Sequence, residues 1–227
     1  KAINLIYPKV KKIAEKSSTV IGKNLQSGEF TYISNDSKIG DNVKIGNNCI
    51  IDSHVNFHQD ISVGDGCKFY SSASIGADPQ DLKYVGEKSK LIIGNDTIIR
   101  EFCTLNRGTK ETGKTIIGDN CLLMAYVHVA HDCIVGNYTI LSNAVQVGGH
   151  VEIGDHVIIG GMTPVHQFCK VGDYSFTGGG YRIVQDIPPY IMAMNEPLVY
   201  SGLNIIGLRR QNFKEESRKT LKQVYKL

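Results

Sequence analysis

The chain has 227 residues, of which 41% are hydrophobic and 21% are charged, and its formal net charge is only +3. This composition fits one globular domain with at most a small appendage, and the mild charge argues against a nucleic-acid partner. The longest apolar runs, such as Val157-Ile158-Ile159, fall far short of the roughly 18 residues that span a bilayer. The lysine-rich N-terminus lacks the apolar region of a signal peptide. We therefore expect a cytoplasmic protein without an integral membrane segment.

Eleven pairs of an aliphatic residue and a glycine, from Ile21-Gly22 to Val171-Gly172, are separated from one another by multiples of six residues. Stepping by six from Ile21 to Ile183 gives 28 positions, of which 23 are apolar. A period of six suits a short strand plus a turn, and three such units close one triangular coil. Coils of about 18 residues then stack at about 4.8 Å, the spacing of neighbouring strands. The pattern predicts an all-β solenoid, a parallel β-helix of hexapeptide repeats, over residues 1–187.

The exceptions to the repeat predict where the chain leaves the solenoid. The charged residues Asp81 and Glu87 break the repeat within residues 77–90, and Glu111 breaks it within residues 106–114. The period resumes in register after each break, so we expect a loop at both places. Insertions on one side of a solenoid often build its binding face.

The two ends of the chain follow the repeat poorly. Residues 1–16 are expected to form an N-terminal cap of the solenoid. Residues 188–227 are expected to form a C-terminal, partly helical segment, in which Asn212 caps a helix that begins near Phe213. Residues 209–227 carry seven basic and two acidic side chains, which favours either an ordinary solvated helix or a docking surface for an acidic partner.

The six cysteines share one position of the repeat, which is otherwise filled by small apolar residues. A disulfide framework or a zinc site would need pairing or CxxC-type spacing, and the sequence has neither. We therefore expect inert core thiols in a reducing compartment. The cysteines are Cys49, Cys67, Cys103, Cys121, Cys133 and Cys169.

Polar residues converge on one edge of the solenoid once the 18-residue coil is imposed. His131 lies one coil below Gly149, and Gln167 lies one coil above it. His150 and His166 are their neighbours in the chain. A histidine is the natural general base near neutral pH, and a glycine N–H can approach a developing oxyanion closely. This edge is therefore the candidate catalytic site.

The same residues leave alternatives open. Asp132 either orients His131 or is simply solvated, and His128, three residues earlier, is a further polar neighbour. A zinc site made of His131, His150 and His166 is the rival interpretation. The sequence has no nucleophile elbow and no Walker-type phosphate loop. Direct base-assisted transfer is therefore favoured over covalent catalysis.

Several motifs between about Ile75 and Phe213 are more specific than the repeat. They include Gln80-Asp81-Leu82-Lys83-Tyr84, Arg107-Gly108-Thr109, His131-Asp132-Cys133, Gly149-His150-Val151, Val165-His166-Gln167-Phe168 and Gln185-Asp186-Ile187-Pro188-Pro189-Tyr190. These motifs closely resemble those of the acyl-[acyl-carrier-protein]–UDP-N-acetylglucosamine O-acyltransferase family, which begins lipid A biosynthesis in Gram-negative bacteria.

The resemblance implies a left-handed parallel β-helix that assembles as a homotrimer with its sites between subunits. It also implies transfer of a 3-hydroxyacyl chain from acyl carrier protein to the 3-position of UDP-N-acetylglucosamine. No separate cofactor or metal is then expected, because the phosphopantetheine of acyl carrier protein delivers the acyl group.

The resemblance also implies roles for individual residues. His131 would be the general base and Gly149 N–H would stabilise the oxyanion, with Asp132 beside them. Asn204 and Arg210 would face the nucleotide. The sugar and the acyl chain would be held by Gln80, Asp81, Lys83, His128, His150, His166 and Gln167, with Gly179 as the residue that limits acyl length.

This sequence departs from the family pattern at the nucleotide end. Ile206 stands where the family often has an acidic residue, and Gln211 stands where a second arginine often follows Arg210. An acceptor with a 3-amino sugar, which would give an amide product, therefore stays open. A different hexapeptide-repeat acyltransferase, a metal-dependent hydratase and a catalytically idle scaffold are the further alternatives.

Overall fold

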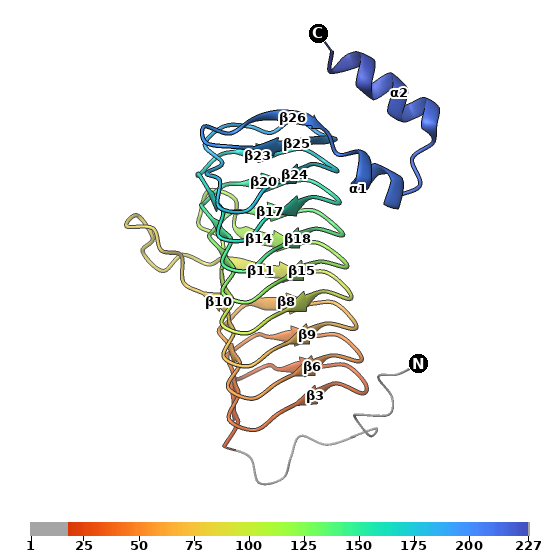
Figure 1. The fold of residues 1–227 in the computed structure, drawn as a ribbon. Coiled ribbons are helices and arrows are strands. Elements are labelled where there is room, and N and C mark those ends of the chain that lie inside the picture. Colours follow the sequence, from red (N-terminus) through yellow and green to blue (C-terminus); the bar gives the residue numbers. More distant parts are fainter. Residues whose placement is uncertain (1–17, 227) are drawn as a thin grey trace.

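The computed structural model describes residues 18–226, most of which form a tall column of stacked coils (Figure 1). Each coil adds one short strand to each of three sheets, so sequence neighbours lie in different sheets. Strand residues in neighbouring uninterrupted coils pair in parallel at a separation of 18, as Val129 pairs with Val147 and Val147 with Val165. The predicted coil length is therefore confirmed. The predicted cap at residues 1–16 lies outside the described residues.

Within residues 18–226 the strands form sheets of eight, eight and ten members. The first sheet contains β1 (Val20–Ile21), β4 (Lys38–Ile39), β7 (Asn56–Phe57), β10 (Ser74–Ala77), β13 (Thr104–Asn106), β16 (His128–Val129), β19 (Gln146–Val147) and β22 (Pro164–Val165). The second contains β2 (Gln26–Ser27), β5 (Lys44–Ile45), β8 (Ile61–Val63), β11 (Lys90–Ile93), β14 (Lys114–Ile117), β17 (Ile134–Val135), β20 (Glu152–Ile153) and β23 (Lys170–Val171). The third contains β3 (Tyr32–Ile33), β6 (Ile50–Ile51), β9 (Lys68–Phe69), β12 (Ile98–Ile99), β15 (Leu122–Leu123), β18 (Ile140–Leu141), β21 (Ile158–Ile159), β24 (Phe176–Thr177), β25 (Ile191–Met194) and β26 (Val199–Leu203).

The chain turns at three edges of the column. We name the first edge where the chain passes from the first sheet to the second, the second edge where it passes from the second to the third, and the third edge where it returns to the first. At each regular turn one residue has a left-handed backbone, as Asp132 at φ 60° and His150 at φ 61° show. This conformation lets two-residue strands follow one another around a corner.

The residue after a left-handed turn residue is usually small and buried, and a cysteine or threonine at this position can bond to a carbonyl of the next coil. The Cys133 thiol donates to the Gly148 carbonyl at 3.0 Å, as the Thr139 hydroxyl donates to the Gly154 carbonyl at 2.9 Å. All six cysteines are buried and unpaired. Burial raises the pKa of Cys103 and of Cys133 to about 12, so both thiols stay neutral at physiological pH. The prediction of inert core thiols fits these surroundings.

Two insertions leave the column at the first edge, after β10 and β13. Ile61 of β8 pairs with Leu91 of β11, so this coil has 30 residues, 12 more than the regular 18. Leu91 pairs in turn with Thr115 of β14, so the next coil has 24 residues, six more than 18. The extra residues lie where the sequence predicted loops, and the longer one projects from the column (Figure 1).

Sheet structure continues beyond residue 187, where the sequence places the end of the solenoid. β25 pairs in parallel with β24, and β26 closes this end by pairing antiparallel with β25. Two helices follow, α1 (Ile205–Arg210) and α2 (Glu215–Val224). No helix among residues 18–226 combines the length and apolarity needed to cross a membrane.

The prediction that Asn212 begins a helix is wrong. Asn212 has φ 59° and follows the end of α1, whereas Lys214 is the N-cap residue of α2. The side chain of Asn204 instead caps α1 by accepting a hydrogen bond from the N–H of Gly207 at 3.1 Å. Asparagine is favoured both at N-caps and at left-handed positions that end helices, so the sequence alone did not separate the two roles.

Candidate active site

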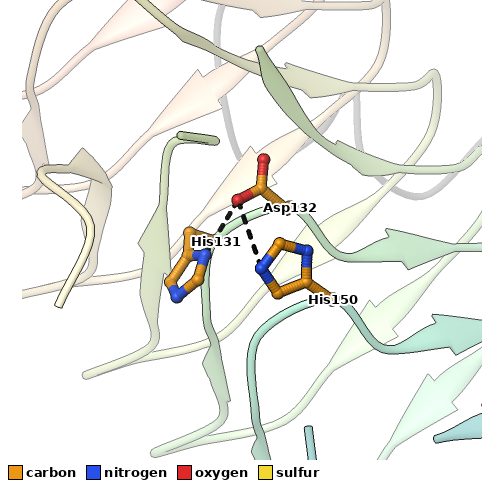
Figure 2. A group of neighbouring side chains, drawn as sticks. All are labelled: His131, Asp132 and His150. Carbon is orange, nitrogen blue, oxygen red and sulfur yellow. Dashed lines mark hydrogen bonds and ion pairs between the residues drawn. The ribbon is translucent and has the colours of Figure 1, made fainter. Parts of the chain in front are cut away.

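His131 and Asp132 lie at the turn that follows β16, on the first edge, and His150 lies at the equivalent turn one coil higher (Figure 2). The Nδ1 atom of His131 lies 2.8 Å from Oδ2 of Asp132. The Asp132 side chain is fully buried, whereas that of His131 is 13% exposed. A partly exposed imidazole is thus backed by a buried carboxylate.

Asp132 is held by the short loop between β13 and β14. Thr109 donates its backbone N–H to Oδ1 at 2.9 Å and its hydroxyl to Oδ2 at 2.7 Å. Thr112 donates its hydroxyl to Oδ1. Burial by itself raises the pKa of Asp132, but the hydrogen bonds from Thr112, His131 and Thr109 together hold that pKa below its ordinary value. Asp132 is therefore an anion at neutral pH.

The ionised carboxylate decides which nitrogen of His131 carries the proton. A carboxylate can only accept hydrogen bonds, so Nδ1 of His131 must be the donor. In the neutral imidazole Nε2 then holds the free lone pair. This is the arrangement in which an orienting carboxylate prepares a histidine to act as a general base.

Gly149 lies directly over this imidazole, where only a glycine fits. A Cβ atom on Gly149 would lie 2.7 Å from Cε1 and 2.8 Å from Nε2 of His131. The absence of a side chain therefore keeps the basic edge of His131 open and lets the backbone of Gly149 approach it.

The backbone N–H of Gly149 has no side-chain acceptor in the coil above it. At the second edge, an Asn or Asp side chain at the same position of the repeat accepts a hydrogen bond from the backbone N–H one coil below. For example, Asn137 N–H donates to Asp155 Oδ1 at 2.6 Å. Gln167 stands at that place above Gly149, and Gly149 N–H has no hydrogen-bond partner within residues 18–226. This unpaired N–H belongs to the residue that lies over the His131 ring, and a free N–H of this kind is suited to stabilise developing negative charge.

His150 completes the cluster. Its Nε2 lies 3.9 Å from Oδ2 of Asp132, and its ring meets the His131 ring edge-on at a centroid distance of 5.1 Å. On its other side, His150 stacks on Phe168 at 4.7 Å. His150 is thus fixed between a carboxylate and an aromatic ring.

The three side chains of this cluster also have the composition of a metal site. One ligand atom from each of His131, Asp132 and His150 lies within 4.8 Å of the others. The predicted zinc set contained His166 in place of Asp132; in the structure Nδ1 of His166 lies 3.0 Å from the Gln167 carbonyl instead. A metal ion at Asp132 would displace hydrogen bonds that already fill both carboxylate oxygens. The donor set therefore fits a metal poorly.

His128 lies on β16, facing outward from the first sheet. Its Nδ1 lies 2.8 Å from the hydroxyl of Thr104, and burial lowers its pKa below the ordinary value. His128 is therefore a neutral hydrogen-bonding side chain at pH 7, on the strand that leads into His131.

Two family models match this chain. "Udp N-acetylglucosamine O-acyltransferase; Domain 2" covers residues 186–227, and "Bacterial transferase hexapeptide (six repeats)" covers residues 114–145. The second match includes the turn that carries His131 and Asp132.

Proteins named acyl-[acyl-carrier-protein]–UDP-N-acetylglucosamine O-acyltransferase are similar over most of the chain. The one from Saccharophagus degradans is 46% identical over 208 residues, which are 91% of this chain and 78% of the relative. The one from Chlorobaculum parvum is 60% identical over 166 residues, 73% of this chain. That match spans 63% of the relative, less than two thirds of its length. The crystal structure of the Moraxella catarrhalis UDP-N-acetylglucosamine O-acyltransferase matches with a TM-score of 0.89 and 42% identity over 91% of this chain and 81% of that one.

This chain belongs to the acyl-[acyl-carrier-protein]–UDP-N-acetylglucosamine O-acyltransferase family. The predicted fold class, a left-handed parallel β-helix with few helices, is confirmed with it.

The residues of the O-acyltransferase loop motif lie away from the histidines within one chain. Gln80, Asp81 and Lys83 lie on the insertion after β10, which projects from the column (Figure 1). Asp81 accepts a hydrogen bond from the backbone N–H of Lys83 at 3.0 Å, so the loop tip has its own turn. Within residues 18–226 no hydrogen bond or ion pair joins these three side chains to His131.

Of the two residues predicted to face the nucleotide, only one is exposed. Arg210 is exposed in the last turn of α1. Asn204 is buried, and its side chain caps α1 and also donates to the Tyr174 carbonyl at 2.9 Å. Asn204 thus has a structural role that the sequence did not reveal. Ile206, at the departure from the family pattern, is 63% exposed.

Gly179 lies on the third edge of the column, not on the first edge with His131. It is exposed, and a Cβ atom on it would lie 3.0 Å from the Gly161 carbonyl oxygen. The ring of Tyr181 covers the neighbouring Gly178, and Arg182 pairs with Glu196 at 2.8 Å. Within this chain neither large side chain therefore lies over Gly179.

Sequence reasoning did not find the threonines that hold Asp132. Thr109 and Thr112 lie in the six-residue insertion, outside the phase of the repeat, and Thr115 accepts the backbone N–H of Asp132 at 2.9 Å. The signal available in the sequence was the insertion itself. It makes this coil 24 residues long and places residue 107 one coil below His131, because 131 − 24 = 107.

Proposed function

We propose that this chain transfers a 3-hydroxyacyl group from acyl carrier protein to the 3-hydroxyl of UDP-N-acetylglucosamine, the first step of lipid A biosynthesis. The observation that carries the proposal is the hydrogen bond of 2.8 Å between His131 and the buried Asp132, with Gly149 over the free nitrogen. Membership of the O-acyltransferase family supports the choice of substrates.

In the proposed reaction Nε2 of His131 takes the proton of the sugar 3-hydroxyl as its oxygen attacks the thioester carbonyl. The N–H of Gly149 stabilises the oxyanion, and Asp132 stabilises the imidazolium that forms. Collapse breaks the carbon–sulfur bond, and the leaving thiolate takes the proton back from His131. The phosphopantetheine arm of acyl carrier protein supplies the thiol, so the transfer needs no further cofactor.

The proposal extends to assembly and compartment. A single edge of the column cannot enclose an acyl chain, so we propose a homotrimer in which the projecting loop of one chain, with Gln80, Asp81 and Lys83, faces the histidines of the next. Because the proposed substrates are an acyl carrier protein and a sugar nucleotide, we also propose that the enzyme acts in the cytoplasm. Light scattering tests the assembly, and a stable, active monomer would contradict it.

Mass spectrometry of the reaction product tests the activity directly. The enzyme is incubated with a panel of acyl-carrier thioesters and with UDP-sugars that carry a hydroxyl or an amine at the 3-position. We expect an ester of UDP-N-acetylglucosamine, and His131→Ala should form it at least about 100-fold more slowly while remaining folded. An amide from the amino sugar alone would identify the acceptor as the 3-amino compound. No product with either acceptor would contradict the proposed function.

A metal-dependent hydratase is the alternative to be tested, because ligand atoms of His131, Asp132 and His150 lie within 4.8 Å of one another, although the hydrogen bonds that fill both oxygens of Asp132 count against a metal. Elemental analysis of the purified protein separates the two functions. About one equivalent of zinc per chain, with activity lost on chelation, would favour the hydratase. Transfer activity that resists chelation would exclude it.

A further inference from the structure

The loop between β13 and β14, residues 107–113, contributes three hydrogen bonds to one carboxylate. Oδ1 of Asp132 accepts hydrogen bonds from the N–H of Thr109 and from the hydroxyl of Thr112. Oδ2 accepts one from the hydroxyl of Thr109. His131 supplies the fourth bond, from Nδ1 to Oδ2. A carboxylate offers about four acceptor positions, so those of Asp132 are filled.

A filled carboxylate cannot rotate without breaking all of these bonds together. The direction in which Oδ2 meets His131 is therefore set by Thr109 and Thr112 rather than by Asp132 alone. His131 has no other hydrogen bond within residues 18–226 that fixes its ring.

The loop itself is braced, so its hydroxyl groups are held in place before any substrate arrives. The side chain of Arg107 is 2% exposed; it donates to the Gly76 carbonyl at 2.7 Å and pairs with Asp78. The backbone N–H of Lys110 donates to Glu87 at 3.1 Å. The loop of residues 107–113, which we call the threonine loop, is thus bonded to the projecting loop after β10. Groups held by such surroundings keep a productive geometry.

We propose that Thr109 and Thr112 are positioning residues for the transfer reaction: by saturating Asp132 they keep His131 in the tautomer and orientation of a general base. This inference rests on the proposed function. It adds a reason for the six-residue insertion, because a regular 18-residue coil would have no segment here to surround the carboxylate.

Steady-state kinetics with acyl carrier thioester and UDP-N-acetylglucosamine give the first test. Replacing both threonines by valine, Thr109→Val/Thr112→Val, should lower kcat about 10-fold to 100-fold and leave both KM values within about twofold, because neither side chain holds substrate. The serine pair, Thr109→Ser/Thr112→Ser, should recover most of the loss. Unchanged kcat, or a change in KM alone, would overturn the proposal.

Thr139→Val is the matched control. The Thr139 hydroxyl is also buried and also bonds across coils, at 2.9 Å to the Gly154 carbonyl, but on the second edge. Its loss should lower Tm and leave kcat unchanged. Thr112 is partly solvent-exposed, so Thr112→Val alone should fold even if the double variant does not, and it should lose kcat in the same direction by a smaller factor.

A double-mutant cycle tests whether the threonines act through Asp132. In an Asp132→Asn background the valine substitutions should cause no further loss of kcat, because the side chain that they position is already changed. Losses that multiply would assign Thr109 and Thr112 a role independent of Asp132 and would overturn the inference.

NMR of protein labelled with 15N-histidine provides a test that needs no activity. The signals of His131 are assigned by comparison with His131→Gln. The parent protein should show the tautomer with hydrogen on Nδ1, and the double valine variant should show a mixture of tautomers. An unchanged tautomer would overturn the inference. A parent without transferase activity would contradict the proposed function but leave this result valid.

Discussion

His131 and Asp132 form a hydrogen bond of 2.8 Å although they are consecutive residues. Consecutive side chains in a strand point to opposite faces and do not meet. Here the left-handed backbone of Asp132, at φ 60°, turns the chain at the corner and brings the carboxylate back to Nδ1 of its neighbour. The period of the repeat thus places a turn where the imidazole and the carboxylate can meet. The carboxylate stays buried beneath the threonine loop.

The acid stability of the protein should depend on Asp132. Although burial raises its pKa, hydrogen bonds from Thr112, His131 and Thr109 leave the pKa below the ordinary value of about 3.9. A lowered pKa stabilises the fold above about pH 4, and this contribution is lost as the pH falls through the pKa of the folded state. We expect the free energy of unfolding, measured in urea at pH 7 and pH 3, to drop more in the parent than in Asp132→Asn.

The comparison isolates Asp132 because other carboxylates with lowered pKa values, such as Glu87 and Glu101, are present in both proteins. Asparagine also tolerates the left-handed backbone at this position. Equal losses of stability in acid would mean that the hydrogen bonds to Asp132 do not favour its charged form.

Gly149→Ala should abolish most of the activity without unfolding the solenoid. The new Cβ atom would lie 2.7 to 2.8 Å from the far edge of the His131 ring, and the ring has to move because the coil backbone is fixed. Displacing the proposed base and crowding the N–H that is proposed to stabilise the oxyanion should lower kcat by about 100-fold. Circular dichroism and Tm report the fold. A variant with parental kcat would show that Nε2 of His131 does not act from this position.

The fold was predictable because each coil repeats the same local structure. An inward aliphatic residue, a left-handed turn and a small buried residue recur every six positions, so the period alone assigns Leu123, Leu141 and Ile159 to the core, where all three are buried. The chain beyond 187 was harder to predict. β25 and β26 extend a sheet without the hexapeptide spacing, and Asn212 follows a helix where an N-cap was expected.

The candidate site was predictable only where the repeat is regular. The stacking of His131, Gly149 and Gln167 follows from the 18-residue coil, but the contacts of Asp132 cross an insertion whose course the period does not specify. Asn204 shows the opposite case. The resemblance marked it for the nucleotide, and the structure adds a helix-capping role that depends on where α1 begins.

Arg210→Ala tests the nucleotide end of the site. Arg210 is exposed in the last turn of α1, and a planar guanidinium suits a diphosphate. The KM for UDP-N-acetylglucosamine should rise about tenfold, as for a lost hydrogen bond to a charged group, with less change in the KM for acyl carrier protein. Arg209→Ala, its exposed neighbour in the same turn, is the control and should have a smaller effect. Equal or reversed effects on the two substrates would assign Arg210 to carrier docking.

Acyl-chain selection should depend on Gly179. Gly179 is exposed on the third edge, with the backbone of Gly161 beneath it, so a side chain at 179 has to extend outward from the column. Because Arg182 pairs with Glu196 and Tyr181 covers Gly178, neither closes the space over Gly179 in this chain. We therefore expect a long 3-hydroxyacyl donor to be preferred over a ten-carbon one.

Gly179→Met should shift the preference toward shorter donors, because a bulky side chain at the position proposed to limit acyl length penalises the longer chain selectively. The value of kcat/KM is measured for donors of increasing length in the parent and the variant. Each methylene that no longer fits should lower kcat/KM at least about tenfold. Gly180→Asn is the matched control. Gly180 has φ 77° with open space around it, and asparagine tolerates that backbone, so chain-length preference should stay parental. If Gly179→Met and the parent show the same preference, Gly179 is an ordinary turn residue, and the groove that measures the acyl chain lies along another part of the column.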